Sequence, residues 1–281
     1  MLVNFIEMLN NAKKERCAIP HFNINNLEWT KIILEKCEEL KIPVILGVSS
    51  SAAKYMGGWY VCYSIVSSLI KDLNLTIPIC LHVDHGTKED CIEAIESGFT
   101  SVMIDGSKFE LTENIRITKE VVEFAHSKNV SVEAEIGTID LAEKKEENCA
   151  DINECIMLCE EANIDALAPA IGNAHGIYIE KPKLNFELLG EINDRIKVPL
   201  VLHGGSGITN NELKKLIQAG ISKVNINTDL QLVWKKAVIK YIENNRDIYD
   251  PRKIIYSGKD EMNKKIEELV DLFETKKVTN L

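Results

Sequence analysis

Short apolar runs alternate along the chain with longer segments in which apolar residues recur every three or four positions. Short runs are typical of strands buried on both faces, and the longer periodic segments are typical of amphipathic helices. The predicted strands are Ala18–Phe22, Val44–Val48, Ile79–Val83, Ser101–Ile104, Val130–Ala134, Ala166–Ala168, Leu200–Leu202 and Lys223–Ile226. The predicted helices are Leu27–Leu40, Trp59–Leu73, Lys88–Ser97, Thr112–Ser127, Ile152–Ala162, Asn210–Ala219 and Leu230–Asn244.

This alternation over 281 residues predicts an α/β fold, a (β/α)8 TIM barrel with a C-terminal helical extension. A doubly wound open sheet has the same alternation. However, no G-x-G-x-x-G opens the first helix, and polar residues follow nearly every strand. No linker interrupts the pattern, so residues 1–281 are expected to form one barrel domain. From about residue 247, the segments Asp247–Lys253 and Lys259–Lys276 predict an extra helix packed outside the barrel.

The composition limits which binding partners and which cellular compartment are expected. The chain has 33 Lys and Arg against 43 Asp and Glu, a net charge of −10, which argues against nucleic acid or an anionic membrane as a partner. It shows no secretion signal and no apolar run of about 18 residues. The 8 cysteines are scattered without a C-x-x-C pair, which indicates reduced thiols in the cytoplasm.

Polar side chains follow the predicted strands, and in a barrel these positions face one common rim. They are Asn23, Ser49, Asp84, His85, Asp105, Glu135, His175, His203, Asn225 and Asn227. Three imidazoles from separate strands beside carboxylates are suited to a divalent metal, whereas each one alone also fits a hydrogen-bonded structural histidine. Of the other histidines, His82 is expected to point into the barrel wall or a hydrogen bond and His126 to lie on the surface. His21 has no predicted role.

Two loops predict an anion site. Leu202–Gly207 carries Gly204, Gly205 and Ser206 before a helix whose capping box is Thr209 with Glu212. The stretch 225–229 opens the next helix, and glycine N–H groups and helix N-termini bind phosphate at this place in barrels. The alternative is two ordinary tight turns.

The residue types restrict the reaction class. No lysine ends a predicted strand, since Lys223 begins its strand, so a Schiff-base mechanism is disfavoured. No G-x-S-x-G or cysteine–histidine pair indicates a nucleophile. A metal beside carboxylates and a phosphate pocket is suited to stabilising an enolate, and it equally permits metal-assisted hydrolysis of a phosphorylated compound.

The chain resembles the class II, metal-dependent ketose-bisphosphate aldolases, the family of fructose- and tagatose-bisphosphate aldolases. The matching stretches follow the same order from end to end. They are Val44–Ser49, Leu81–Gly86, Ser101–Ser107, Val132–Gly137, Ala170–Gly176, Leu202–Gly207, Lys223–Asp229 and Tyr249–Lys253.

The resemblance implies that His85, His175 and His203 ligate a catalytic Zn²⁺. Asp105 and Glu135 resemble carboxylates that hold the metal in an alternative position or tune its ligands. Asp84 resembles the residue that takes the C4 hydroxyl proton in cleavage. The expected substrate pocket, with a monovalent cation (Na⁺ or K⁺) near the phosphate, comprises Asn23, Ser49, Gly176, Gly204, Gly205, Ser206, Asn225, Asn227 and Thr228.

Arg252 matches an arginine that reaches the distal phosphate from the partner subunit, which implies a homodimer or homotetramer. Its alternative is a surface salt bridge. Two segments depart from the family pattern. The run Gly137–Lys144 lacks the usual glycine pair in a shortened loop, and within it Glu143 aligns best with the acid that protonates the enediolate. Ile179 stands where fructose-type relatives have lysine, so either Lys181 substitutes for that lysine or the specificity for the sugar end has changed.

The sequence therefore predicts a cytoplasmic, glycolytic lyase. It would cleave fructose 1,6-bisphosphate reversibly to dihydroxyacetone phosphate and glyceraldehyde 3-phosphate. Tagatose 1,6-bisphosphate or another phosphorylated ketose is the nearest alternative. More distant alternatives are a metal-dependent phosphohydrolase and a non-catalytic barrel that binds sugar phosphates.

Overall fold

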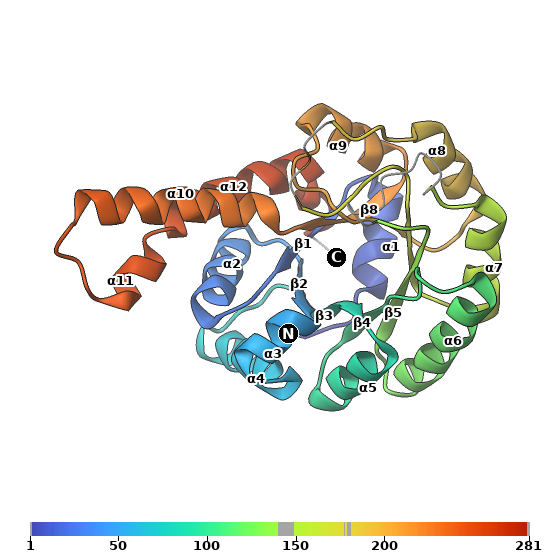
Figure 1. Ribbon diagram of the computed structural model, residues 1–281, viewed down its shortest axis with the longest axis horizontal. Helices are drawn as coiled ribbons and strands as arrows, with labels where there is room; N and C mark the ends of the chain where they lie inside the picture. The colour runs from blue at the N-terminus through green and yellow to red at the C-terminus, as the bar shows by residue number, and fades with distance from the viewer. Residues whose placement is uncertain (1, 140–148, 177, 179–180, 280–281) are drawn as a thin grey trace.

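The computed structural model, which describes residues 2–139, 149–176, 178 and 181–279, contains a closed parallel barrel (Figure 1). The strands pair in chain order, β1 to β8, and β8 pairs with β1 to close the barrel. They are β1 Ile19–Asn23, β2 Val44–Ser49, β3 Ile79–Gly86, β4 Ser101–Ile104, β5 Ser131–Ile136, β6 Ala166–Pro169, β7 Leu200–Leu202 and β8 Ile221–Ile226. The predicted barrel is confirmed.

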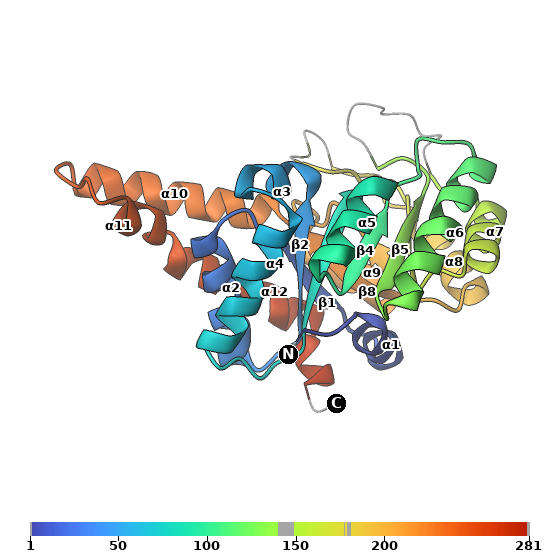
Figure 2. The ribbon, with the colours of Figure 1, turned by 90° about the horizontal axis from the view of Figure 1, so that it is seen from below.

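Helices surround the barrel, and the segment that contains α1 covers its floor (Figure 2). They are α1 Ile6–Glu15, α2 Leu27–Leu40, α3 Ser50–Met56, α4 Trp59–Asp72, α5 Lys88–Ser97, α6 Leu111–Ser127, α7 Ile152–Ala162, α8 Phe186–Arg195, α9 Asn210–Gln218, α10 Thr228–Asn244, α11 Pro251–Tyr256 and α12 Lys259–Phe273, with a 3₁₀ turn at Thr275–Val278. The capping box of Thr209 and Glu212 at the start of α9 is confirmed.

Three helices were not predicted, and the single tail helix was wrong. The missed helices α1, α3 and α8 have at most ten residues each, so their apolar periodicity is weak. The tail contains α11 and α12 as separate helices, with Pro251 at the start of α11, where a proline without an N–H fits the first helical turn.

The strands divide their side chains between two environments. On β5, Val132 and Ala134 belong to the apolar layer beneath the helices, while Glu133 reaches across the interior to residues of other strands. The barrel floor is apolar, because Phe5, Leu9 and other residues of the α1 segment pack there on inward side chains such as that of Ile45. The interior is therefore apolar at the floor and polar toward the rim.

Several strand ends lie one to three residues from their predicted positions, and the start of the last strand is the one that affects the site. The last strand starts at Ile221, so Lys223 is its third residue and not its first. The Lys223 side chain is fully buried inside the barrel, where the pattern of apolar positions alone predicts no charge. The ammonium group of Lys223 therefore lies inside the barrel, beneath the rim.

Helices α10, α11 and α12 form an arm that extends beyond the barrel (Figures 1 and 2). The α12 helix packs on α10, α2 and α9, and α11 lies toward the outer end of α10. Among the described residues, none of the helices has the length and apolar character needed to cross a bilayer.

Candidate active site

Three histidines meet at the carboxyl ends of the strands. His85 belongs to β3, His175 follows β6, and His203 directly follows β7. His85 Nε2 lies 3.1 Å from His175 Nε2 and 2.9 Å from His203 Nδ1, and the last two atoms are 3.4 Å apart. The structure therefore brings together the three imidazoles predicted from separate strands.

A local distortion of β3 directs two consecutive side chains to this point. Neighbouring residues of a regular strand face opposite sides, yet Asp84 Oδ1 and His85 Nε2 are only 4.0 Å apart. His85 has a left-handed backbone (φ 54°), and the pairing register with β4 shifts between Val83 and Gly86. Such a bulge redirects a side chain, here that of a histidine.

Hydrogen bonds on the far side of two rings determine which nitrogens face the shared point. His203 Nε2 donates to Glu133 Oε1 at 2.7 Å, and His85 Nδ1 donates to Asp105 Oδ2 at 2.9 Å. When both rings are neutral, their inward nitrogens therefore carry lone pairs, which repel one another unless a cation lies between them. Bonds of 2.0–2.1 Å to a tetrahedral metal place ligand nitrogens about 3.3 Å apart, so the three histidines fit such an ion.

A second group of candidate ligands adjoins the first. Ligand atoms of His85, Asp105 and Glu135 lie within 4.8 Å of one another. Glu135 Oε2 is buried and makes no hydrogen bond within the described part of the chain. Burial raises the pKa of Glu135 to about 8, with His85 opposing and Asp105 adding to the shift. Despite burial, Asp105, Asp84 and Glu135 raise the pKa of His85 to about 9, so this region favours positive charge.

Asp84 lies beside the histidines with both carboxylate oxygens hydrogen-bonded. Asn23 Nδ2 donates to Oδ2 at 2.7 Å, and Asn225 Nδ2 donates to Oδ1 at 3.3 Å. Burial opposes ionisation, yet the adjacent imidazoles and the Asn23 amide hold the pKa of Asp84 well below its ordinary value. The group is therefore an ionised, oriented carboxylate.

The predicted anion loops form the other wall of the site. At Gly204 (φ 63°) a Cβ would lie 2.0 Å from the Ala174 carbonyl oxygen, so only glycine fits. The Asp229 N–H donates to Ser206 Oγ at 3.2 Å, which joins the two loops. A small cavity of about 90 Å³ lies between them and is lined by ten predicted residues: Asn23, Asp84, His175, Gly176, His203, Gly204, Ser206, Asn225, Asn227 and Thr228.

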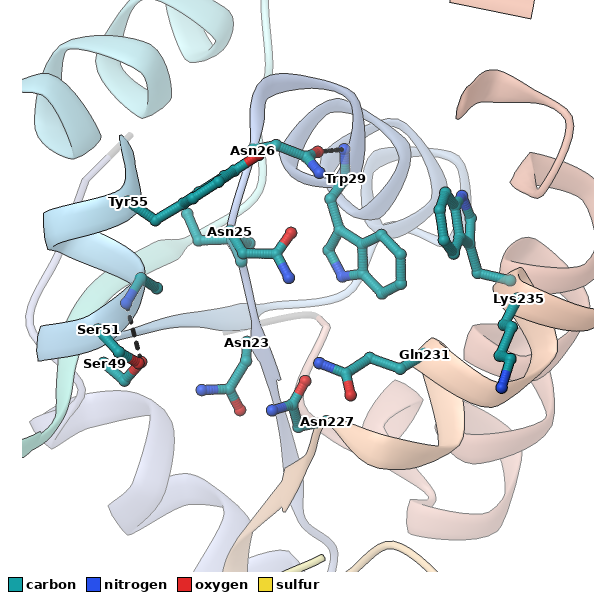
Figure 3. Close-up of a pocket in the computed structure, with 13 residues that line it drawn as sticks. Asn23, Asn25, Asn26, Trp29, Ser49, Ser51, Tyr55, Asn227, Gln231 and Lys235 are labelled. Carbon is teal, nitrogen blue, oxygen red and sulfur yellow. Dashed lines mark hydrogen bonds between the residues drawn. The ribbon is translucent and has the colours of Figure 1, made fainter. Parts of the chain in front are cut away.

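A larger pocket of about 620 Å³ adjoins this cavity and shares Asn23 and Asn227 with it (Figure 3). Ser49, which caps α3, lies on one side, and Gln231 and Lys235 of α10 line another. Among the described residues, none with a carboxylate side chain lines this pocket. The small cavity and this pocket are therefore neighbours along the rim.

Several residues of the site were not predicted as functional. Glu133 and Lys223 lie beneath His203, and Asn173 Nδ2 donates to the His203 carbonyl oxygen at 2.9 Å. Tyr178 Oη accepts from the Ala174 N–H at 2.8 Å and donates to the Gly204 carbonyl oxygen at 3.0 Å. The sequence did offer a signal for Glu133. It lies two residues before Glu135 in the same strand, and alternate residues of a strand point to the same side, here into the barrel.

The remaining predictions have different outcomes. His82 Nδ1 pairs with Ser101 Oγ at 2.8 Å, and His126 is partly exposed beside Asp165, as expected. Arg252 is 87% exposed, pairs with Asp250 at 2.8 Å and lines neither of the two rim cavities. Glu143 and Ile179 lie outside the described residues. Gly205 does not line the cavity, but its N–H donates to the Asn225 carbonyl oxygen.

The fold and the site define a parallel-barrel enzyme whose rim gathers three imidazoles, three carboxylates and two glycine-rich or helix-opening loops. Residues 3–277 match the family described as Fructose-bisphosphate aldolase class-II. The chain therefore belongs to the class-II fructose-bisphosphate aldolase family, an enzyme family of lyases.

Individual relatives agree with this assignment. A fructose-bisphosphate aldolase of Geobacillus stearothermophilus is 48% identical over 264 residues, covering 92% of each chain. One of Staphylococcus aureus is 46% identical over 282 residues, covering 98% of each. Among solved structures, the YdjI aldolase of Escherichia coli K12 superposes with a TM-score of 0.86 at 33% identity over 98% of each chain.

Proposed function

We propose that this enzyme cleaves fructose 1,6-bisphosphate reversibly into dihydroxyacetone phosphate and glyceraldehyde 3-phosphate. The observation that carries the proposal is the convergence of three metal-facing imidazole nitrogens beside the ionised Asp84, next to the glycine-rich loop. Relatives named fructose-bisphosphate aldolase, at 46–48% identity over more than nine-tenths of the chain, support this substrate over other ketose phosphates.

We assign Zn²⁺ as the resident metal, held by His85, His175 and His203. Neutral imidazoles suit this ion, and burial lowers the pKa of His203 to about 4, which keeps its ring neutral. When bound, the metal supplies Lewis-acid polarisation of the ketose carbonyl. Asp105 and Glu135 would hold the ion in a second position or tune His85.

Side chains of the protein then accept the proton released in cleavage and return a proton to the three-carbon fragment. Asp84 accepts the C4 hydroxyl proton as the C3–C4 bond breaks, and Asn23 and Asn225 hold its oxygens in place. The electron pair stays on the three-carbon fragment as an enediolate, which must regain a proton at C3. Glu143, whose structure is not described, is the proposed acid for that step.

The phosphate of the three-carbon fragment is assigned to the small cavity. Gly176, Gly204 and Ser206 would offer backbone N–H groups or a hydroxyl from one side, and Gly205 would hold this loop through its N–H bond to the Asn225 carbonyl oxygen. Asn225, Asn227 and Thr228 would close the other side at the start of α10. A monovalent cation beside this phosphate belongs to the proposal. Ser49 and the larger pocket would receive the aldehyde fragment.

We propose that the active unit is at least a homodimer in which Arg252 serves the partner's site. Arg252 is highly exposed on α11, toward the outer end of the arm, so it is available to a second copy. The exposed apolar residues Leu232, Ile239 and Ile242 recur at helical spacing along α10 and provide a face for that copy. A cytoplasmic location is also proposed, supported by eight free thiols, most of them buried.

Mixing two deficient variants tests the shared site. Arg252→Ala and Asp84→Ala homodimers are each expected to cleave slowly at low substrate concentration. When they are co-expressed, half of the dimers are mixed and each of these holds one intact site, so about a quarter of the wild-type activity is expected to return. Activity that never exceeds the sum of the separate variants would show that Arg252 acts within its own subunit or not at all.

Metal removal tests the proposed reaction itself. Purified enzyme is expected to release dihydroxyacetone phosphate from fructose 1,6-bisphosphate, to lose this activity after chelation and to regain it with Zn²⁺. The same assay on tagatose 1,6-bisphosphate measures sugar preference, and a parallel assay measures inorganic phosphate. Faster cleavage of tagatose 1,6-bisphosphate would reassign the substrate, and phosphate release would indicate a phosphohydrolase.

A further inference from the structure

A lysine is buried inside the barrel directly beneath the histidine cluster. The Lys223 side chain is 0% exposed, and its Nζ lies 2.6 Å from Glu133 Oε2. The other oxygen of the same carboxylate accepts from His203 Nε2 at 2.7 Å. One carboxylate therefore joins a buried cation to a rim histidine.

The buried ammonium group of Lys223 has few interaction partners inside the barrel. A buried charge is very unfavourable unless it is paired, and Glu133 is its one ion-pair partner among the described residues. Lys223 Nζ also lies 3.2 Å from His82 Nε2, and Ser101 Oγ orients that ring from its other nitrogen at 2.8 Å. Two contacts in fixed directions thus hold the lysine, which in turn holds Glu133 Oε2 away from His203.

We propose that Lys223 is a positioning residue for the metal site and that it acts through Glu133. By occupying Oε2, it leaves Oε1 directed at His203, which keeps the proton on Nε2 and the lone pair of Nδ1 facing the other two imidazoles. This inference rests on the proposed metal site. Without the lysine, Glu133 can rotate, and His203 can adopt the tautomer that places an N–H where the metal must bind.

Lys223 does not serve as a nucleophile in this arrangement. Its side chain lines neither the small cavity nor the larger pocket, and its Nζ faces a carboxylate beneath the rim. The histidines lie between Lys223 and a substrate carbonyl bound in the site. The role that remains for the buried charge is to orient the groups above it.

The experiment measures the dissociation constant of Zn²⁺ by competition with a chelator, for the wild type, Lys223→Met, Glu133→Gln and the double variant. Each single variant is expected to bind Zn²⁺ about 10–100-fold more weakly. The double variant should bind no more weakly than Glu133→Gln alone, because Lys223 acts through that carboxylate. Ile45→Ala, which truncates a fully buried residue of the barrel floor, is the matched control: it should lower thermal stability and leave Zn²⁺ affinity unchanged.

A spectroscopic readout separates positioning from stability. The visible absorption of the Co²⁺-substituted protein should change in Lys223→Met and remain that of the wild type in Ile45→Ala. An unchanged Zn²⁺ affinity in folded Lys223→Met would overturn the inference, as would losses that add in the double variant. If Lys223→Met does not fold, comparing Glu133→Gln with the double variant, which removes both charges, decides the question. A wild-type protein that binds no Zn²⁺ would instead refute the metal site of the proposed function.

Discussion

Replacing Asp84 by alanine is expected to slow cleavage of fructose 1,6-bisphosphate by about 10²–10⁴-fold, the usual contribution of a positioned general base. Asp84 is the ionised carboxylate that Asn23 and Asn225 hold at the small cavity. Its nearer oxygen lies 4.0 Å from His85 Nε2, so it is adjacent to the histidine cluster without being one of its three imidazoles. The variant should therefore keep its bound Zn²⁺, which elemental analysis of the purified protein measures.

Two further measurements restrict the role to the C4 proton. Asp84→Asn preserves the volume of the side chain but cannot take a proton, so it should lose as much activity as the alanine variant. Exchange of the C1 proton of dihydroxyacetone phosphate with solvent should persist in both, because that step uses a different group. Cleavage within about tenfold of the wild type in either variant would assign the proton transfer to another residue.

Replacing His203 by alanine is expected to weaken Zn²⁺ binding by more than about 100-fold, since even the loss of a residue that only supports a ligand costs 10–100-fold. Cleavage should fall with it. His203 is fully buried, and its two ring nitrogens contact both the other imidazoles and Glu133. Removal of the ring leaves two imidazoles at the site and Glu133 Oε1 without its hydrogen-bond donor. Zinc content and cleavage after dialysis against Zn²⁺ measure the effect.

His126 provides the matched control for a histidine-to-alanine change. It is partly exposed, pairs with Asp165 at 2.9 Å, and belongs neither to the candidate metal ligands nor to the lining of the two rim cavities. His126→Ala should retain full zinc and activity and lose at most about 1 kcal/mol of stability. Stoichiometric zinc in folded His203→Ala protein would contradict the proposed ligand set.

The two variants are expected to fail in different ways. Asp84→Ala should hold zinc and bind dihydroxyacetone phosphate without cleaving the ketose, whereas His203→Ala should lose the metal and with it every later step. A shared phenotype, with zinc lost from both, would show that Asp84 also takes part in holding the metal.

The apolar periodicity predicted the strands closely because a buried parallel strand needs a run of apolar residues whatever its neighbours are. It did not predict α1, α3 and α8, which are short, or the break between α11 and α12. Short helices depend on the surfaces they cover, as α1 does on the barrel floor, and those surfaces do not exist in the sequence.

The candidate site followed from one topological rule. Because all strands of a parallel barrel end at the same rim, polar residues after separate strands must converge. This rule predicted six of the ten residues around the small cavity, namely Asn23, Asp84, His175, His203, Asn225 and Asn227. The predicted anion loops or the family resemblance supplied the other four. This rule did not predict Glu133 and Lys223, because they lie in the middle of strands and not at their carboxyl ends. They are 90 residues apart in the sequence, and only closure of the barrel brings them within 2.6 Å.

The amino-acid sequence by itself determined the barrel, the rim residues and the family resemblance, since each depends on periodicity or on residue types at strand ends. Only the tertiary structure decided how the site is oriented. The bulge at His85 turns two successive side chains inward, and the buried charge of Lys223 selects the oxygen that Glu133 presents to His203. These features depend on contacts across the closed barrel, where local sequence patterns carry no information about which partner a side chain meets.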